Sequence, residues 1–136
     1  MPHISKQQIE SKVFNGLYHE LESLIVKTKA ENARLVLSGL LTPTEKIMLT
    51  KRLAAGIMYG RGCSQYQVWN TLKVSPSTAA RMKLTYERGA YDSVLSTLND
   101  SQVKNIWPLI ERISRGGLPP LGKGRWNYVM KKLDGE

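Results

Sequence analysis

The sequence has few of the residues on which covalent and metal chemistry depend. Among its 136 residues are one cysteine, Cys63, and two histidines, His3 and His19. A single cysteine excludes an intrachain disulfide, so a reducing cytoplasm is the expected compartment. The few Cys and His residues do not form the cluster of ligands that a metal site needs. Paired carboxylates and phosphate-binding glycine motifs are also missing, so we expect no enzyme, no cofactor and no metal.

Long hydrophobic runs are missing as well. The longest apolar stretches, such as residues 35–37 and 53–55, fall far short of the ~18 residues that a membrane-spanning helix requires. The N-terminus also lacks the apolar core of a signal peptide. With 41% hydrophobic residues, the chain can still build a modest core. We therefore expect a soluble protein without a membrane partner.

Acidic residues are absent from the middle of the chain. None occurs in residues 46–86, whereas the same stretch carries seven basic residues: Lys46, Lys51, Arg52, Arg61, Lys73, Arg81 and Lys83. Residues 42–91 hold eight basic and two acidic residues, and so contribute +6 of the formal net charge of +9. An uncompensated positive block of this kind indicates a polyanionic partner.

The N-terminal third has the pattern of two amphipathic helices. Apolar residues recur at three- and four-residue steps over residues 5–28: Ile9, Val13, Phe14, Leu17, Leu21, Leu24 and Ile25. A second, shorter helix is expected over residues 31–40. Because neither helix has a core of its own to bury against, we predict that residues 1–41 form a dimerisation arm. The alternative is that they fold back on their own domain.

Capping signals divide residues 42–91 into three helices. Thr42, Pro43 and Glu45 form a strong helix start, and that helix should end near Tyr59 at a following glycine. Residues 64–67 form a second capping box. Ser75 and Pro76 then open a helix with its natural stop at Gly89.

The last two of these helices have the spacing of a helix-turn-helix. The positions that such a motif buries are here Gln65, Val68, Leu72, Val74, Ala79 and Met82. Lys73 replaces the usual turn glycine, and Trp69 stands where a small residue is common. The sequence leaves open whether Trp69 faces outward or packs on the N-terminal arm. The recognition-helix candidate is residues 75–88.

That helix has the chemistry of a reader of duplex DNA. Its N-terminal amides can donate hydrogen bonds to a phosphate. Arg81 can give two hydrogen bonds to one guanine, and Ala80 can meet a thymine methyl group. The predicted DNA contacts are Gln65, Lys73, Ser75, Ser77, Thr78, Ala80, Arg81 and Lys83. The alternative is that these residues are solvated groups on an ordinary helical hairpin.

Residues 92–136 combine one predicted helix with a basic tail. The helix is capped at Asn99 and should pass through Ile110, with Pro108 as a kink or an early stop. Residues 115–124 are too rich in Gly and Pro for regular structure. Lys123 and Arg125 are candidate contacts to phosphates or the minor groove. Otherwise this region is a solubilising tail with aromatic residues docked on the protein.

Four short motifs, in order, resemble the tryptophan-repressor superfamily. They are Leu-Leu-Thr-Pro-Thr-Glu at 40–45, Lys-Arg-Leu at 51–53, Gly-Cys-Ser-Gln at 62–65 and Val-Ser-Pro-Ser-Thr-Ala-Ala-Arg at 74–81. The resemblance covers residues 42–89, and the two preceding helices fit the family's dimer arm. It implies an all-α helical bundle with a helix-turn-helix, assembled as an intertwined homodimer. Such a dimer would bind a pseudo-palindromic operator in double-stranded DNA and act as a repressor-like, bacterial transcriptional regulator.

The same resemblance assigns an effector pocket, which this chain changes at two positions. Arg52 and Arg81 match the two arginines that sandwich the indole of the corepressor. The matching polar residues complete the set of Thr42, Arg52, Arg81 and Thr85. Yet Met82 replaces the glycine that leaves room for the ligand, and Gly56 replaces an apolar wall. We therefore expect neither tryptophan nor another small effector.

A different function class also fits the helices. The chain could be a protein-interaction adaptor, or a DNA-binding subunit of a mobile-element complex, that recruits its partner through residues 92–136. Exposed, unpaired aromatic rings at Trp107, Trp126 and Tyr128 would favour that class.

Overall fold

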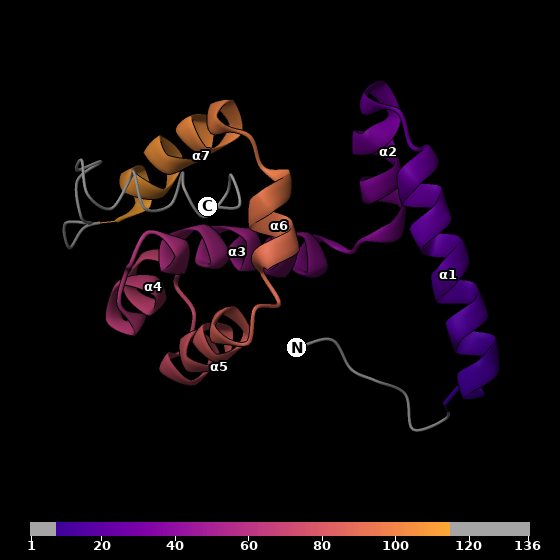
Figure 1. The fold of residues 1–136 in the computed structure, drawn as a ribbon, viewed down its shortest axis with the longest axis horizontal. Helices are drawn as coiled ribbons and strands as arrows, with labels where there is room; N and C mark the ends of the chain where they lie inside the picture. Colours follow the sequence, from indigo (N-terminus) through magenta and orange to yellow (C-terminus); the bar gives the residue numbers. More distant parts are fainter. Residues whose placement is uncertain (1–7, 115–136) are drawn as a thin grey trace. The chain divides into compact units, whose positions relative to one another are not determined.

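A computed structural model describes residues 8–114 of the chain. These residues form seven helices and no strand, which confirms the all-α class (Figure 1). In chain order the helices are α1 (Ser11–Lys27), α2 (Ala30–Leu40), α3 (Pro43–Gly60), α4 (Gln65–Leu72), α5 (Pro76–Glu87), α6 (Asp92–Thr97) and α7 (Asp100–Ile113). The chain divides into two compact units, and the division falls within α3, after Ile47. The sequence prediction placed a boundary before Thr42, at the start signal of this helix.

The first unit leaves its apolar side chains largely open to solvent. Neither α1 nor α2 has a buried residue. Leu21 and Val36 are partly buried. The large apolar side chains that stay exposed on these helices are Val13, Phe14, Leu17, Tyr18, Leu24, Ile25, Val26, Leu35, Leu37 and Leu40. The predicted amphipathic pattern is therefore present, but most of its apolar side chains are exposed in the part of the chain that the structure describes.

The start of α3 confirms the capping signal in the sequence. The amide of Glu45 donates to Thr42 Oγ1 at 3.1 Å, and the amide of Thr42 donates to Glu45 Oε1 at 2.9 Å. Hydrogen bonding of the Glu45 carboxylate to Thr42, first to its backbone amide and then to its side chain, favours the charged form and lowers the pKa of Glu45. The helix ends at Gly60. Gly62 follows with φ +86°, a conformation that glycine adopts without steric cost.

The caps of the next helices are also those predicted. Gln67 N donates to Ser64 Oγ at 3.1 Å and Ser64 N donates to Gln67 Oε1 at 2.8 Å, which completes the second capping box. Ser75 Oγ accepts from Thr78 N at 3.1 Å at the start of α5. After α5, Gly89 has φ +83°. Capping hydrogen bonds therefore fix the starts of α4 and α5, and a left-handed glycine follows the end of α5.

The C-terminal helices depart from the prediction in two respects. Helix α6 was not predicted from the sequence. Helix α7 begins at its predicted cap, where Gln102 N donates to Asn99 Oδ1 at 2.8 Å, but it passes Pro108 and continues to Ile113. The early stop was therefore wrong. Pro108 and Lys104 are exposed, so water can satisfy the carbonyl that the missing proline N–H leaves open.

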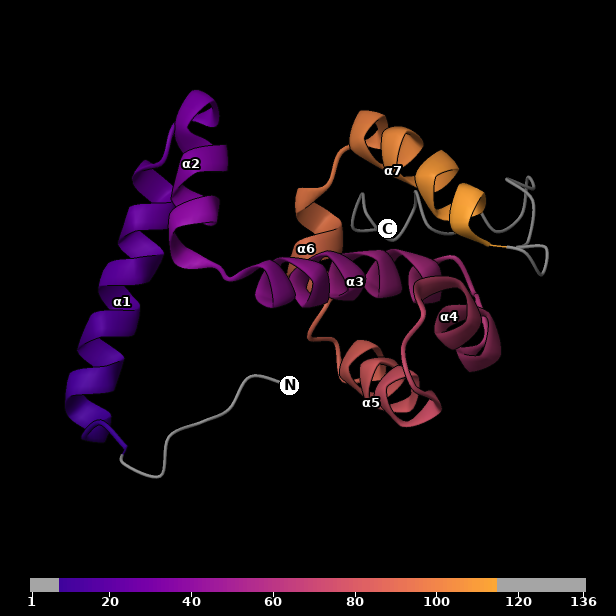
Figure 2. The same ribbon diagram turned by 180° about the vertical axis from the view of Figure 1, so that it is seen from behind.

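The core of the second unit lies where the C-terminal half of α3 meets the later helices. Figures 1 and 2 show α3 running between α5 on one side and α7 on the other. Ala55, Met58, Val68, Ala79 and Trp107 are fully buried. Of the positions expected to be buried in the helix-turn-helix, Val68, Leu72, Ala79 and Met82 are buried, whereas Gln65 and Val74 are only partly so.

Candidate nucleic-acid interface

Helices α4 and α5 pack against each other through a turn in which Lys73 takes the place of glycine. Lys73 has φ 56° and ψ 47°, in the left-handed region, and its amide donates to Trp69 O. Its ammonium donates to Asn70 O at 3.0 Å, and Lys51 Nζ on α3 donates to Lys73 O at 3.1 Å. The turn thus keeps the geometry that glycine normally supplies, and two lysine side chains hold it.

The orientation of α5 is fixed by buried contacts from α3. Tyr59 is buried, and its hydroxyl donates to Ala79 O at 2.7 Å. Burial is the main cause that raises the pKa of Tyr59 to about 12, so the hydroxyl remains a neutral donor at physiological pH. Ala79 and Met82 face the core. The opposite side of α5 must therefore face outward.

That outward side carries the residues predicted to read bases. Ser77 and Arg81 are exposed and Ala80 is partly exposed. The same helical period adds Leu84, which is 50% exposed, and Arg88. We refer to Ser77, Ala80, Arg81, Leu84 and Arg88 as the α5 outer face. Sequence reasoning missed Leu84 and Arg88, although steps of three, four and seven residues from Ser77 and Arg81 reach both.

The remaining predicted contacts surround the turn and the start of α5. Lys73 and Ser75 are exposed, whereas Gln65, Thr78 and Lys83 are partly buried. Ser75 Oγ donates to Thr78 Oγ1 at 2.8 Å, and Arg81 Nη2 donates to the same oxygen at 3.4 Å. Thr78 therefore orients Ser75 and Arg81 from within the helix.

Arg61, one of the seven basic residues of the acid-free block, lies in the core and not on a surface. Arg61 is only 2% exposed, and its Cζ lies 3.6 Å from the ring centroid of Trp107, which is fully buried. Burial lowers the pKa of Arg61 to about 10, which leaves the side chain cationic at neutral pH. Arg61 is thus part of the core, where its guanidinium packs on the ring of Trp107. The expectation that Trp107 could be an exposed, unpaired aromatic was wrong for the same reason.

In the effector pocket suggested by the resemblance, side chains fill the space at both changed positions: Met82 itself at one, and Tyr91 beside Gly56 at the other. Met82 is buried. A Cβ added at Gly56 would lie 2.9 Å from Tyr91 Cδ1, so the ring of Tyr91 occupies the space above this glycine. Arg52 and Arg81 are exposed, and Thr85 Oγ1 donates to Arg81 O at 3.0 Å.

The fourth residue of that set, Thr42, lies in the first unit and caps α3. Its hydroxyl oxygen therefore already accepts a backbone hydrogen bond. Thr42 thus has a structural role as a helix cap, and the space above Gly56 is filled. Nothing in residues 8–114 therefore indicates a site for an indole ligand.

Trp69 is partly buried and packs against the core of the second unit. Its ring meets that of Tyr66 edge to face, with the centroids 5.2 Å apart. A large side chain at this position is therefore accommodated by packing within its own unit.

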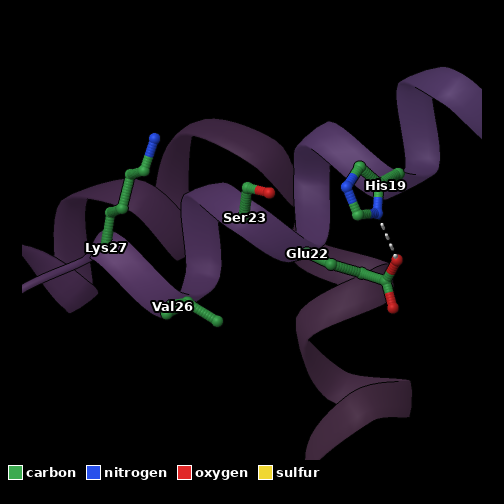
Figure 3. A pocket seen from close by; sticks show the side chains of 5 residues that line it. All are labelled: His19, Glu22, Ser23, Val26 and Lys27. Carbon is green, nitrogen blue, oxygen red and sulfur yellow. Dashed lines mark ion pairs between the residues drawn. The ribbon is translucent and has the colours of Figure 1, made fainter.

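Figure 3 shows a hollow along α1 that contains one of the two histidines. His19 Nδ1 lies 3.8 Å from Glu22 Oε1, and the two side chains are 75% and 61% exposed. The described residues that line the hollow all come from α1. Because an exposed pair on one helix neither excludes water nor encloses a substrate, this hollow does not resemble a catalytic site.

Within residues 8–114, no group of three or more His, Cys, Asp or Glu side chains could hold a metal ion. None of the described helices is long and apolar enough to cross a membrane. The candidate tail contacts Lys123 and Arg125, and the aromatic residues Trp126 and Tyr128, lie outside the described residues.

Comparison of the chain with protein-family models gives no match, and neither the curated proteins nor the solved structures contain a significant match.

Proposed function

We propose that this protein is a sequence-specific, double-stranded DNA-binding transcriptional regulator that acts without tryptophan as corepressor. The observation that supports this most is the α5 outer face. It presents Ser77, Ala80 and Arg81 to solvent from the second helix of a helix-turn-helix with a well-capped start.

The chemistry of this face suits the major groove. Arg81 supplies the two parallel donors that recognise the edge of guanine, and Ala80 offers a methyl group to thymine. Lys73 and Ser75, at the turn, are placed to meet phosphates. No acidic residue lies between Glu45 and Glu87 in the sequence, so this segment carries no negative charge that would repel the DNA phosphates. Base reading and phosphate attraction therefore come from the same pair of helices.

We further propose that the protein acts as a homodimer. Residues 8–114 leave the apolar side chains of α1 and α2 exposed, and a second copy is the simplest closed solution to cover them. Two copies related by a two-fold axis would present two α5 helices, which corresponds to a pseudo-palindromic operator. Multi-angle light scattering of the full chain tests this step. A folded monomer at micromolar concentration would rule it out.

Selection of binding sites from random duplexes tests the function itself. We expect enrichment of one pseudo-palindromic sequence, because two equivalent helices read it. Affinity for that sequence should fall with salt, with a log–log slope of about −0.9 for each phosphate that the protein neutralises. Failure to enrich any sequence, or an affinity that salt does not change, would contradict the proposal.

The protein-interaction class makes the opposite prediction. Exposed aromatic residues would favour this class, but one of the three candidates, Trp107, is fully buried. An adaptor of this kind would bind no duplex in the selection experiment. The same measurement therefore separates the adaptor from the DNA-binding regulator.

A further inference from the structure

A groove lies between α3 and α7 on the second unit, and α7 lies on the side of α3 opposite to α5 (Figures 1 and 2). Its volume is about 450 Å³. Most of the side chains that line it are aliphatic, and they include Leu53, Ala54, Leu72, Ile106, Leu109 and Ile110. Two cationic side chains, Lys51 and Arg112, also line it, and none of residues 8–114 contributes a carboxylate to it. The groove thus joins an apolar wall to positive charge.

These properties match a small-molecule site more closely than a bare hydrophobic contact. Sites for small molecules have volumes of roughly 300–1,000 Å³, are mostly apolar and contain a few polar groups that orient the ligand. Two cations without a carboxylate select an anion. We propose that this groove binds a small molecule with an apolar body and one carboxylate group.

The contacts of Lys51 connect such a ligand to the helix-turn-helix. Lys51 lines the groove, and its ammonium also donates to Lys73 O at 3.1 Å. Lys73 is the left-handed residue between α4 and α5. A carboxylate bound to Lys51 would compete with that carbonyl and loosen the turn. The ligand would therefore weaken DNA binding, since a ligand shifts an equilibrium by its differential affinity for the two states. This last step rests on the proposed function.

Isothermal titration calorimetry of the full chain tests the binding step with two probes of similar shape. Phenylbutyrate carries the apolar body and the carboxylate, and phenylbutanol lacks only the charge. We expect saturable binding of phenylbutyrate and a loss of about tenfold or more for the alcohol, as for a charge-assisted hydrogen bond. Absence of saturable phenylbutyrate binding, or equal affinity for the two probes, would overturn the proposal.

Three variants locate the site. Arg112→Met and Lys51→Met should each weaken phenylbutyrate and leave phenylbutanol unchanged, and Arg112→Met does so without touching the Lys73 turn. Leu109→Gln should weaken both probes. Leu109 is 58% exposed, so this change spares the core. Val94→Gln, at a 38% exposed position on α6 outside the groove, is the matched control and should change neither affinity.

Sedimentation of the same variants tests whether a second copy occupies the groove. We expect Leu109→Gln and Val94→Gln to have the oligomeric state of the unmodified chain. A change in Leu109→Gln alone would identify the groove as a protein interface and overturn the ligand proposal. Phenylbutyrate binding that Leu109→Gln leaves intact would overturn it as well.

Titration of the selected operator with phenylbutyrate tests the regulatory step. We expect weaker DNA binding by the unmodified chain and no effect of the probe on Lys51→Met. If no duplex is selected at all, the proposed function fails, while the calorimetry still decides whether the groove binds its ligand. If the operator binds and phenylbutyrate binds without changing DNA affinity, the regulatory step fails and the proposed function stands.

Discussion

Arg61 Cζ lies 3.6 Å from the ring centroid of Trp107, and both side chains are buried in the core of the second unit. The face of an indole ring attracts a cation, and Glu111 adds a favourable charge. The contact connects the end of α3 to α7. A basic residue from the acid-free block thus stabilises the scaffold that holds the helix-turn-helix.

This contact predicts a large loss of stability on truncation of Arg61. Arg61→Ala removes the charge and the aliphatic part of the side chain that packs in the core. We therefore expect the free energy of unfolding, measured in urea, to fall by about 2–4 kcal/mol. Arg61→Met keeps most of the stem and separates packing from charge. Arg81→Ala is the matched control. Because Arg81 is exposed, this substitution should lower the free energy of unfolding by less than about 0.5 kcal/mol. Equal costs for Arg61→Ala and Arg81→Ala would show that the buried contact contributes nothing.

The left-handed conformation of Lys73 predicts that glycine is better tolerated there. A side chain at φ 56° costs about 1–2 kcal/mol, part of which is offset by the larger entropy of glycine in the unfolded chain. Lys73→Gly should therefore stabilise the protein by about 0.5–1 kcal/mol in thermal unfolding. Gly62→Ala, at φ +86°, is the converse control and should be destabilising. A less stable Lys73→Gly variant would mean that the lysine hydrogen bond to Asn70 O outweighs the backbone cost.

Features that depend on neighbouring residues were predictable from the sequence, and features that depend on distant residues were not. The caps at Ser64, Ser75 and Asn99 depend on residues three positions away, and all three were predicted. Helix α6 was missed because its N-cap, Tyr91, provides no side-chain hydrogen bond and its six residues are too few to show a period.

Burial of charge was the other failure. Composition assigns Arg61 to a solvated surface because its partner, Trp107, is far away in the sequence. The role of Tyr91 escaped notice for the same reason, since only the fold brings its ring against Gly56. The outer face of α5, by contrast, follows from helical spacing within one element.

The filled space around Gly56 predicts that tryptophan does not bind. Tyr91 would have to leave before a ligand could approach the Gly56 backbone, and Met82 is buried as well. Tryptophan should therefore change neither the melting temperature nor the affinity for the selected operator. Met82→Gly should cost about 2–5 kcal/mol and still bind no tryptophan, because Tyr91 remains in place. Calorimetry on both proteins decides this, and micromolar binding that Arg112→Met, a change in the separate α3/α7 groove, leaves intact would show that the pocket beside Gly56 has been kept.

The α5 outer face predicts a split between specificity and affinity. Arg81→Ala should weaken the free energy of operator binding by roughly 1–3 kcal/mol and relax the preference at one base pair of each half-site. Lys73→Ala should weaken all sequences alike and reduce the salt slope by about one contact. Repeating the site selection with each variant measures both effects. Uniform weakening by both variants would reduce Arg81 to a phosphate contact.

Leu84 gives the most specific prediction about what α5 reads. It is 50% exposed on the side of the helix shared by Ser77 and Arg81, and an apolar side chain in the major groove recognises the C5-methyl group of thymine. The selected operator should therefore contain a thymine whose replacement by deoxyuracil, which removes only that methyl, weakens binding by the unmodified protein. Leu84→Ala should bind the two duplexes equally, whereas Val94→Ala, a control on α6, should keep the preference. If Leu84→Ala still distinguishes thymine from deoxyuracil at every position, the leucine does not contact a base, and the specificity of α5 rests on the residues nearer its N-terminus.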